Sequence, residues 1–273
     1  MNVLSLFDGM SCGQIALDKL GIKVDNYFAS EIDKYAMQVT MKNYPNTKQI
    51  GSVTDVKAKD LPGIDLLFGG SPCQSFSNAG NGKGFDGKSG LFWEFVRVLK
   101  ETKPKYFMLE NVVMKKEWEQ VITDALGVEP IKINSKLVSA QSRPRLYWTN
   151  ISLDIIEDKG ITLNDVLEDS ADIKYKISDA KIDRVLNTKR GKGFFYNKEN
   201  EKTGTLISGY YKQPTDGIYV DLGFKRRLTP TECEKLQTVP FNYTDCVSDS
   251  QRYKMIGNGW TVDVIAHIFK NIV

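Results

Sequence analysis

The sequence lacks the residues that metal sites and disulfide frameworks need. Its 273 residues include a single histidine, His267, and four cysteines with no Cys-x-x-Cys spacing. These residues do not supply the clustered ligands of a zinc site or the paired thiols of a small secreted scaffold. The composition therefore argues against a metal centre and against disulfides, and it favours reduced thiols.

Long apolar runs are also missing. No stretch approaches the roughly 20 apolar residues that span a bilayer, and the amino-terminal segment reaches Asp8 without the basic start of a secretory signal. Hydrophobic residues make up 41% and charged residues 26% of the chain, as in globular proteins. We therefore expect a soluble, cytoplasmic protein with a sizeable core and no membrane partner.

Net charge is small, at +3, but the charges are segregated along the chain. Residues 151–172 contain seven acidic residues and one basic residue, whereas residues 181–202 contain seven basic and three acidic residues. The basic segment also holds glycines and the aromatic run Phe194–Tyr196, a composition that suits a loop following a phosphate backbone. An ordinary solvated surface loop is the alternative, and charge alone does not separate the two.

The first half of the chain alternates short apolar strands with helical patterns, which indicates βαβ units and a parallel sheet. The predicted strands cover residues 3–7, 27–29, 64–68 and 106–109, and the predicted helices cover 14–20, 33–43 and 91–100. After about residue 150 the pattern changes, and residues 170–225 are polar and turn-rich without clear helical alternation. Helical patterns return at Thr229-Pro230, an amino-terminal capping sequence, and at residues 262–272.

These patterns predict an α/β fold with a doubly wound sheet and a smaller, irregular second domain. We place the larger domain at residues 1–150 plus 250–273. A linker and the small domain then occupy residues 151–249, with the core of the small domain at about 170–225.

A glycine turn connects the first predicted strand to the first predicted helix. Glycine beside Asp8 lets a ligand approach the backbone closely, and the helix start offers unpaired N–H groups. The turn is not Gly-x-Gly-x-x-Gly, and Asp8 would repel a pyrophosphate. Glu31, after the second strand, is placed to accept ribose hydroxyls. These features favour a nucleoside without phosphates, such as S-adenosylmethionine, although many turns contain glycine only for tightness.

Cys73 follows Pro72 at the end of the third predicted strand. This position suits a nucleophile better than core packing, although free cysteines are more often buried and inert. Five glycines between residues 80 and 90 predict a loop able to close over a substrate. The only histidine lies on an apolar helix and is expected to be structural, which argues against a cysteine protease or an ordinary acyl transferase.

Glu110 and two arginines complete the candidate set. Glu110 follows another predicted strand, and Arg143 and Arg145 alternate on an extended segment, which directs both guanidinium groups to one side. Each residue alone suits a surface position or a structural ion pair. Together with Cys73 they suit attack on an electron-poor ring. A thiolate adds to C6 of a pyrimidine, a carboxylic acid binds N3, and guanidinium binds the C2 carbonyl. The resulting enamine has a nucleophilic C5 that takes a methyl group.

With these residues the chain resembles the DNA (cytosine-5) methyltransferases over nearly its whole length. The resemblance lies in short motifs in the usual order of that family: residues 7–13, Ser71–Gln74, Glu110–Val112, Gln141–Arg145, Arg226–Gln237 and Gly257–Trp260. It implies a Rossmann-like methyltransferase sheet with a smaller target-recognition domain. It also implies S-adenosyl-L-methionine as cofactor, S-adenosyl-L-homocysteine as product, no metal, and double-stranded DNA as substrate.

The resemblance assigns roles residue by residue. Cys73 is expected to be the nucleophile and Glu110 the acid at N3, while Arg143 and Arg145 hold the base and the Cys73 loop. The residues expected to bind the cofactor are Phe7, Asp8, Gly9, Met10, Cys12, Glu31, Ile32, Ser52, Val53, Gly70, Pro72, Leu91, Asn258 and Trp260. Those expected to bind DNA are Gln74, Ser75, Lys189, Arg190 and Lys192.

The motifs depart from the usual family pattern in places. The turn Gly9–Gly13 stands for Gly-x-Gly-Gly, and Gly70–Cys73 stands for Gly-Phe-Pro-Cys, both closer to the animal de novo branch. Ser52 stands where the family has an aspartate facing the adenine amino group, and Asp55 can replace that aspartate if the loop register differs.

Two other functions stay open on the sequence. A relative in this family methylates cytosine in tRNA with the same active site, and a non-catalytic DNA-binding subunit is a third interpretation. The basic segment and the separate small domain favour duplex DNA, and the intact catalytic set favours an enzyme. The absence of regulatory extensions predicts a stand-alone microbial or viral protein. We expect a monomer, with a restriction enzyme as a candidate counterpart.

Overall fold

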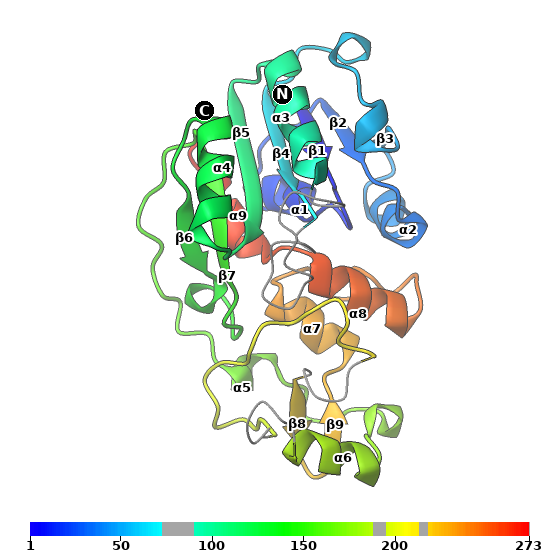
Figure 1. Cartoon of the computed structure of the whole chain (residues 1–273). Coiled ribbons are helices and arrows are strands. Elements are labelled where there is room, and N and C mark those ends of the chain that lie inside the picture. The colour runs from blue at the N-terminus through cyan, green and yellow to red at the C-terminus, as the bar shows by residue number, and fades with distance from the viewer. Residues whose placement is uncertain (73–89, 188–194, 213–217, 273) are drawn as a thin grey trace. The chain divides into compact units, whose positions relative to one another are not determined.

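The computed structural model describes residues 1–72, 90–187, 195–212 and 218–272, which form two compact units (Figure 1). The first unit comprises residues 1–134, 144–155 and 264–273, and the second comprises residues 135–143 and 156–263. The domain boundaries predicted near residues 150 and 250 stay a prediction.

Seven strands of the first unit form one sheet, in the order β3–β2–β1–β4–β5–β7–β6. They are β1 (Asn2–Leu6), β2 (Asn26–Ser30), β3 (Lys48–Gln49), β4 (Leu66–Gly70), β5 (Tyr106–Val112), β6 (Ile131–Asn134) and β7 (Pro144–Thr149). The strands β1 to β5 pair in parallel, whereas β7 runs antiparallel to both of its neighbours. The sequence did not indicate this reversal. Residues 135–143 join β6 to β7 without the longer crossover connection that a parallel pair needs.

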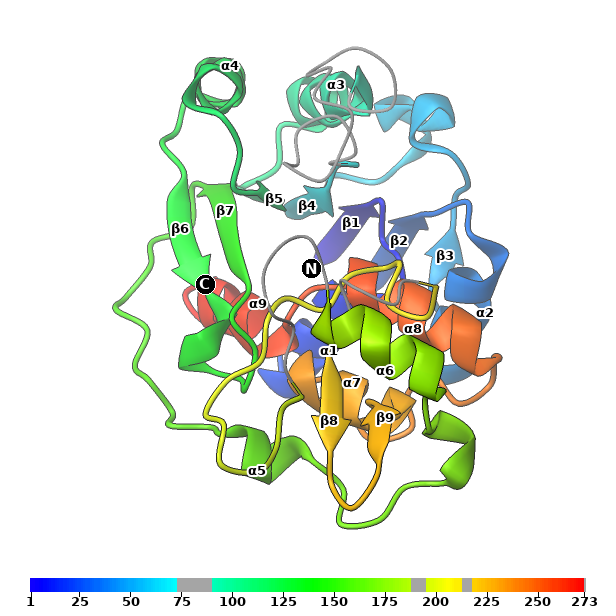
Figure 2. The same ribbon diagram turned by 60° about the horizontal axis from the view of Figure 1, so that its bottom comes forward.

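Helices cover both faces of the sheet, as a doubly wound fold requires. In the first unit they are α1 (Cys12–Lys19), α2 (Lys34–Asn43), α3 (Phe92–Thr102), α4 (Lys116–Leu126) and the end of α9 (Val262–Phe269). Figures 1 and 2 show α3 and α4 on one face and α1 and α9 on the other. The α/β fold class predicted from the sequence is therefore confirmed.

The core of the first unit follows the alternation of side chains along the strands. Leu4 and Leu6 of β1 belong to the same buried cluster as Phe92 and Phe95 of α3. On the opposite face the ring of Phe68 approaches α1 and α9. A Cβ atom at Gly13 would lie 2.3 Å from this ring, and the Phe68 and Phe269 ring centroids are 5.2 Å apart. Glycine at position 13 therefore allows α1 to approach the sheet closely.

The second unit contains short elements. They are α5 (Leu163–Val166), α6 (Asp179–Leu186), α7 (Pro230–Leu236), α8 (Asp249–Asn258) and a hairpin of β8 (Tyr219–Asp221) and β9 (Lys225–Arg227). Short 3₁₀ helices span Ser135–Leu137 and Ile173–Tyr175 in this unit, and Val53–Asp55 and Ala58–Asp60 in the first unit. The expectation that residues 170–225 lack helix is wrong at α6. Its apolar residues Ile182, Val185 and Leu186 do have helical spacing, but they cover only two turns within a polar segment.

The capping sequence predicted at Thr229 is present at the start of α7. The Thr229 hydroxyl accepts a hydrogen bond from the Glu232 N–H, and the Glu232 carboxylate accepts one from the Thr229 N–H. Both oxygens of Glu232 also accept hydrogen bonds from Arg226, at 2.8 Å each, and both side chains are buried. This ion pair fixes the end of the hairpin to α7. No helix within the described residues is long and apolar enough to cross a membrane.

Candidate active site

The turn after β1 is fastened to the end of β2 through Glu31. One oxygen of its carboxylate accepts the Gly9 N–H, and the other accepts the N–H groups of Ile32 and Asp33, each at 2.7 Å. Gly9 has a φ angle of +60° and Ser11 one of +61°, in the left-handed region where glycine is unstrained. A carboxylate has about four acceptor positions. Glu31 therefore orders this turn and still has capacity for a ligand hydroxyl.

Asp8 is turned into the protein. Its carboxylate accepts hydrogen bonds from the hydroxyls of Tyr27, at 2.7 Å, and Ser11. Burial disfavours the charged carboxylate and raises the pKa of Asp8 to about 6, although the hydrogen bonds from Ser11 and Tyr27 oppose the rise. The Asp8 side chain thus stabilises the turn from inside.

The loop after β3 lies beside the loops after β1 and β2 at the same edge of the sheet. Ser30, at the end of β2, donates its hydroxyl to the Gly51 carbonyl at 2.8 Å. Ser52 accepts a hydrogen bond from the Thr54 N–H and caps the 3₁₀ helix that buries Val53. The loops that follow β1, β2 and β3 therefore bring together most of the expected cofactor residues.

The other expected cofactor residues differ in burial and position. Ile32 is 79% exposed, an unusual environment for an isoleucine, whereas Met10 and Cys12 are buried. Leu91 directly precedes α3. Both Leu91 and Phe7 pack against the buried core cluster of the first unit. Gly70 ends β4 and Pro72 follows it closely. Asn258 and Trp260 belong to the second unit, at the end of α8.

Glu110 and Arg145 form an ion pair between neighbouring strands. In the antiparallel register Val112 of β5 stands opposite Arg145 of β7, which places Arg145 diagonal to Glu110 on the same face. Arg145 Nε lies 3.0 Å from Glu110 Oε1, and the two side chains are only 13% and 11% exposed. The strand register therefore brings together a carboxyl and a guanidinium that the sequence separates by 35 positions.

The end of β4 lies beside this pair. Gly70 is the partner of Glu110 in the parallel register of β4 and β5. The buried side chain of Asn111 donates to the Ser71 hydroxyl at 3.0 Å and so ties the two strand ends together. Cys73, Gln74 and Ser75 follow in the chain but lie outside the described residues.

Arg143 has different partners from Arg145 and belongs to the second unit. Its buried guanidinium donates hydrogen bonds to three carbonyls, those of Leu206 at 2.7 Å, Gly257 at 3.2 Å and Gly259 at 2.9 Å. Arg143 therefore connects a segment of the region expected to recognise the target with the turn that carries Asn258.

Two glutamines extend this buried cluster, and the sequence indicated no separate role for either. Gln237 donates to the carbonyls of Ile256 and Gly259 and accepts the Thr261 hydroxyl at 2.8 Å. Gln141 donates to Gln237 and accepts the Leu206 N–H at 2.6 Å. In the sequence, only the spacing of Gln141 and Arg143 by two residues indicates that their side chains lie on one side of an extended segment. Lys189, Arg190 and Lys192, expected to bind DNA, lie outside the described part of the chain.

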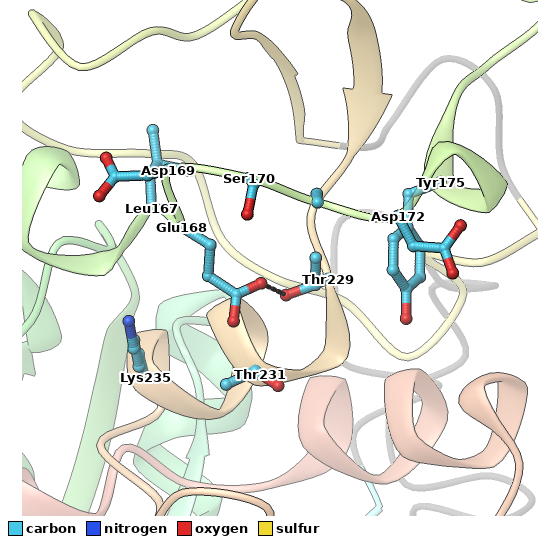
Figure 3. Close-up of a pocket in the computed structure, with 10 residues that line it drawn as sticks. Leu167, Glu168, Asp169, Ser170, Asp172, Tyr175, Thr229, Thr231 and Lys235 are labelled. Carbon is cyan, nitrogen blue, oxygen red and sulfur yellow. Dashed lines mark hydrogen bonds between the residues drawn. The ribbon is translucent and has the colours of Figure 1, made fainter.

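A pocket of about 470 Å³ in the second unit has an acidic lining (Figure 3). It includes Glu168, Asp169 and Asp172 but none of the predicted site residues. Glu168 accepts the Thr229 hydroxyl at 2.8 Å, and Asp169 is paired with Lys198, so two of its acids have partners. An acidic lining does not suit an anionic substrate. The described residues contain no group of three His, Cys, Asp or Glu side chains able to hold a metal.

Comparison with protein families decides the identity. The family model for C-5 cytosine-specific DNA methylases matches residues 1–273, the whole chain. The chain belongs to this family. It is a DNA cytosine-5 methyltransferase, and membership implies S-adenosylmethionine as the methyl donor and DNA as the substrate.

Relatives of this C-5 cytosine-specific DNA methylase include Type II methyltransferase M1.ScrFI of Lactococcus lactis subsp. cremoris, which is 33% identical over 99% of this chain and 77% of the relative. Type II methyltransferase M.NlaX of Neisseria lactamica is 33% identical over 97% of this chain and 94% of the relative.

Solved structures share the fold of the chain. The Entamoeba histolytica methyltransferase EhMeth has a TM-score of 0.82 at 20% identity and covers 100% of this chain and 99% of its own. The S. pombe Dnmt2 methyltransferase has a TM-score of 0.77 at 18% identity, covering 98% and 97%. At these identities the likeness concerns the fold alone.

Proposed function

We propose that the protein transfers a methyl group to C5 of a cytosine that has left the stack of duplex DNA, through a covalent bond between Cys73 and C6. Inside the duplex a thiolate cannot reach C6, so the base has to be extruded first. Cys73 acts as the nucleophile, Glu110 as the acid at N3, and Arg145 orients Glu110 and the C2 carbonyl of the base.

The reaction begins with addition of the Cys73 thiolate to C6. The electron pair of the C5–C6 double bond then forms a C4–C5 double bond, and the pair of the C4–N3 double bond takes a proton from Glu110 at N3, which gives an enamine. S-adenosylmethionine, when bound, would supply the electrophilic methyl that C5 takes, with S-adenosylhomocysteine as the leaving group. Loss of the C5 proton to a base and of the thiolate from C6 restores the double bond, and N3 returns its proton to Glu110.

The observation that carries this proposal is the ion pair of Glu110 and Arg145 beside the end of β4. Its carboxyl and guanidinium lie 3.0 Å apart and are largely buried, as groups that act on one base need to be. The strand partner of Glu110 is Gly70, three residues before Cys73. A base held against this pair would therefore lie close to the point where the chain reaches the nucleophile.

The turn residues fit a nucleoside cofactor. Glu31 accepts backbone N–H groups and retains acceptor capacity for a ribose hydroxyl. The exposed side chain of Ile32 offers an apolar surface for an adenine ring. We infer that the three loops after β1, β2 and β3 hold the nucleoside, and Asn258 and Trp260 stay proposed cofactor residues on the motif resemblance.

Arg143 acts as a positioning residue in this scheme, since its guanidinium donates hydrogen bonds to the backbone carbonyls of Leu206, Gly257 and Gly259. Residues 170–225 read the DNA sequence, with Gln74, Ser75, Lys189, Arg190 and Lys192 as further contacts. The Type II names of the relatives support a role in restriction–modification, with a restriction enzyme of matching specificity as the counterpart.

Trapping on duplex DNA that contains 5-fluorocytosine tests this function. Fluorine at C5 cannot leave as a proton, so the bond between Cys73 and C6 persists and the complex survives denaturing electrophoresis. We expect trapping by the wild type and by Cys246→Ala, which removes a different cysteine thiol. Cys73→Ala should trap nothing. A trapped Cys73→Ala complex, or none with the wild type, contradicts the mechanism. Parallel methyl incorporation into duplex DNA and tRNA tests the substrate.

A further inference from the structure

Buried and half-buried cations of the second unit usually have a partner of opposite charge. Lys225 Nζ lies 2.9 Å from Asp221, across the β8–β9 hairpin, and Arg226 pairs with the buried Glu232. These partners neutralise charges that would otherwise be costly to remove from water. The hairpin is therefore built with its positive charges compensated, with one exception.

The exception is Arg227 of β9, and Lys181 of the neighbouring helix α6 shares its lack of an acidic partner within the described part of the chain. Both side chains are partly buried, and neither forms an ion pair with any residue that the structure describes.

Tyr219 brings these two cations together. It stands directly opposite Arg227 in the antiparallel register, so both side chains project from the same face of the hairpin. Helix α6 lies beside this hairpin and crosses its strands (Figure 2), and Ile177, Val185 and Tyr219 form a small buried cluster. Lys181 Nζ lies 5.7 Å from the centroid of the Tyr219 ring. Lys181 therefore contacts the ring of the residue that stands opposite Arg227 in the hairpin.

The two charges affect each other. Burial lowers the pKa of Lys181, and the positive charge of Arg227 lowers it further. Two like charges in a partly buried position oppose folding, and an anion bound between them would remove the repulsion. A guanidinium supplies a planar fork of donors and an ammonium a compact charge, a combination that suits the oxygens of a phosphate.

We propose that Lys181 and Arg227 together bind one phosphate of the DNA backbone. The site rests on the proposed function, because it would hold the duplex against the target-recognition region. A phosphate contact carries no sequence information itself, but it fixes the register of the protein on the duplex. The pair would therefore position α6 and the hairpin on DNA of any sequence.

Salt-dependent binding of a labelled 30-base-pair duplex by the full chain tests the site. A phosphate contact contributes about 0.9 to the slope of log affinity against log salt. Lys181→Gln and Arg227→Gln should each reduce the slope by about 1 and weaken binding about 8-fold at 0.1 M salt. The double variant should lose about the same factor rather than the product, since both side chains share one phosphate. Lys225→Gln, the control with a paired lysine, should leave the slope unchanged.

Thermal unfolding without DNA gives a second readout. Each single substitution removes a repulsion, so both should raise the melting temperature while weakening binding. A lower melting temperature together with weaker binding would show a structural role and overturn the site. An equal loss in Lys225→Gln, or an unchanged slope in Lys181→Gln, also overturns it. In those cases wild-type methylation would continue, whereas a wild type that neither binds nor methylates duplex DNA refutes the proposed function and this site with it.

Discussion

Replacement of Arg143 by methionine should destabilise the protein strongly, because its guanidinium donates hydrogen bonds to carbonyls in two segments far apart in the chain, at Leu206 and at Gly257 and Gly259. The substitution keeps most of the apolar volume but removes every donor. In the variant the carbonyls of Leu206 and Gly257 lose the hydrogen bond from Arg143. The Gly259 carbonyl still accepts a hydrogen bond from Gln237 Nε2 at 3.1 Å. An unsatisfied buried polar group costs about 1–3 kcal/mol. Two such groups make the expected loss about 4 kcal/mol.

Calorimetric unfolding measures this loss. A change of 1 kcal/mol shifts the melting temperature of a domain of this size by about 2–4 °C, so Arg143→Met should melt about 8–16 °C below the wild type. Arg143→Lys keeps the charge and should lose less. Arg184→Met is the matched control, since Arg184 is exposed on α6, and it should stay within about 0.5 kcal/mol of the wild type. If Arg143→Met behaves like this control, the three hydrogen bonds do not support the fold and the reasoning is refuted.

Two further predictions concern the turn after β1 and the turn after α8. The pKa of Asp8 is raised to about 6 in the folded protein, so the stability it confers is fully present below the unfolded pKa near 4 and is lost as the pH rises through 6. The free energy of unfolding of Asp8→Asn, measured in urea, should therefore rise by about 3 kcal/mol relative to that of the wild type between pH 4 and pH 7. If the difference between the two free energies does not change with pH, the raised pKa of Asp8 is contradicted. A Cβ atom at Gly257 would lie 2.3 Å from the backbone of Ile207, so Gly257→Ala should destabilise by about 1–3 kcal/mol. Gly63→Ala, with open space around its Cβ, is the control, and equal stability of the two variants in thermal unfolding would count against this close contact.

The helix start at Thr229 shows what local sequence predicts well. Its hydroxyl, Pro230 and Glu232 interact within one turn, so the capping pattern is complete in four consecutive residues. The strands and the first helices were predictable for the same reason, because their apolar spacing is a local property. Helix α6 was missed because its apolar spacing, at Ile182, Val185 and Leu186, extends over only two turns.

The partners of Arg143 could not be predicted from the sequence. Its hydrogen bonds reach residues 63, 114 and 116 positions away. The sequence led to the expectation that both guanidinium groups project to one side, toward the base. In the structure Arg145 contacts Glu110, while Arg143 contacts three backbone carbonyls in the second unit.

The sequence by itself determined the lack of Cys-x-x-Cys spacing, the alternation of strands and helices, and the ordered motifs of a C-5 cytosine-specific DNA methylase, because these depend on residue type and short spacing. Tertiary structure alone decided the antiparallel direction of β7, the diagonal contact of Arg145 with Glu110, and the contact of Lys181 with Tyr219, the strand partner of Arg227. These depend on strand register and on packing between residues far apart in the chain. The net charge of +3 contains no information about which cations lie near one another.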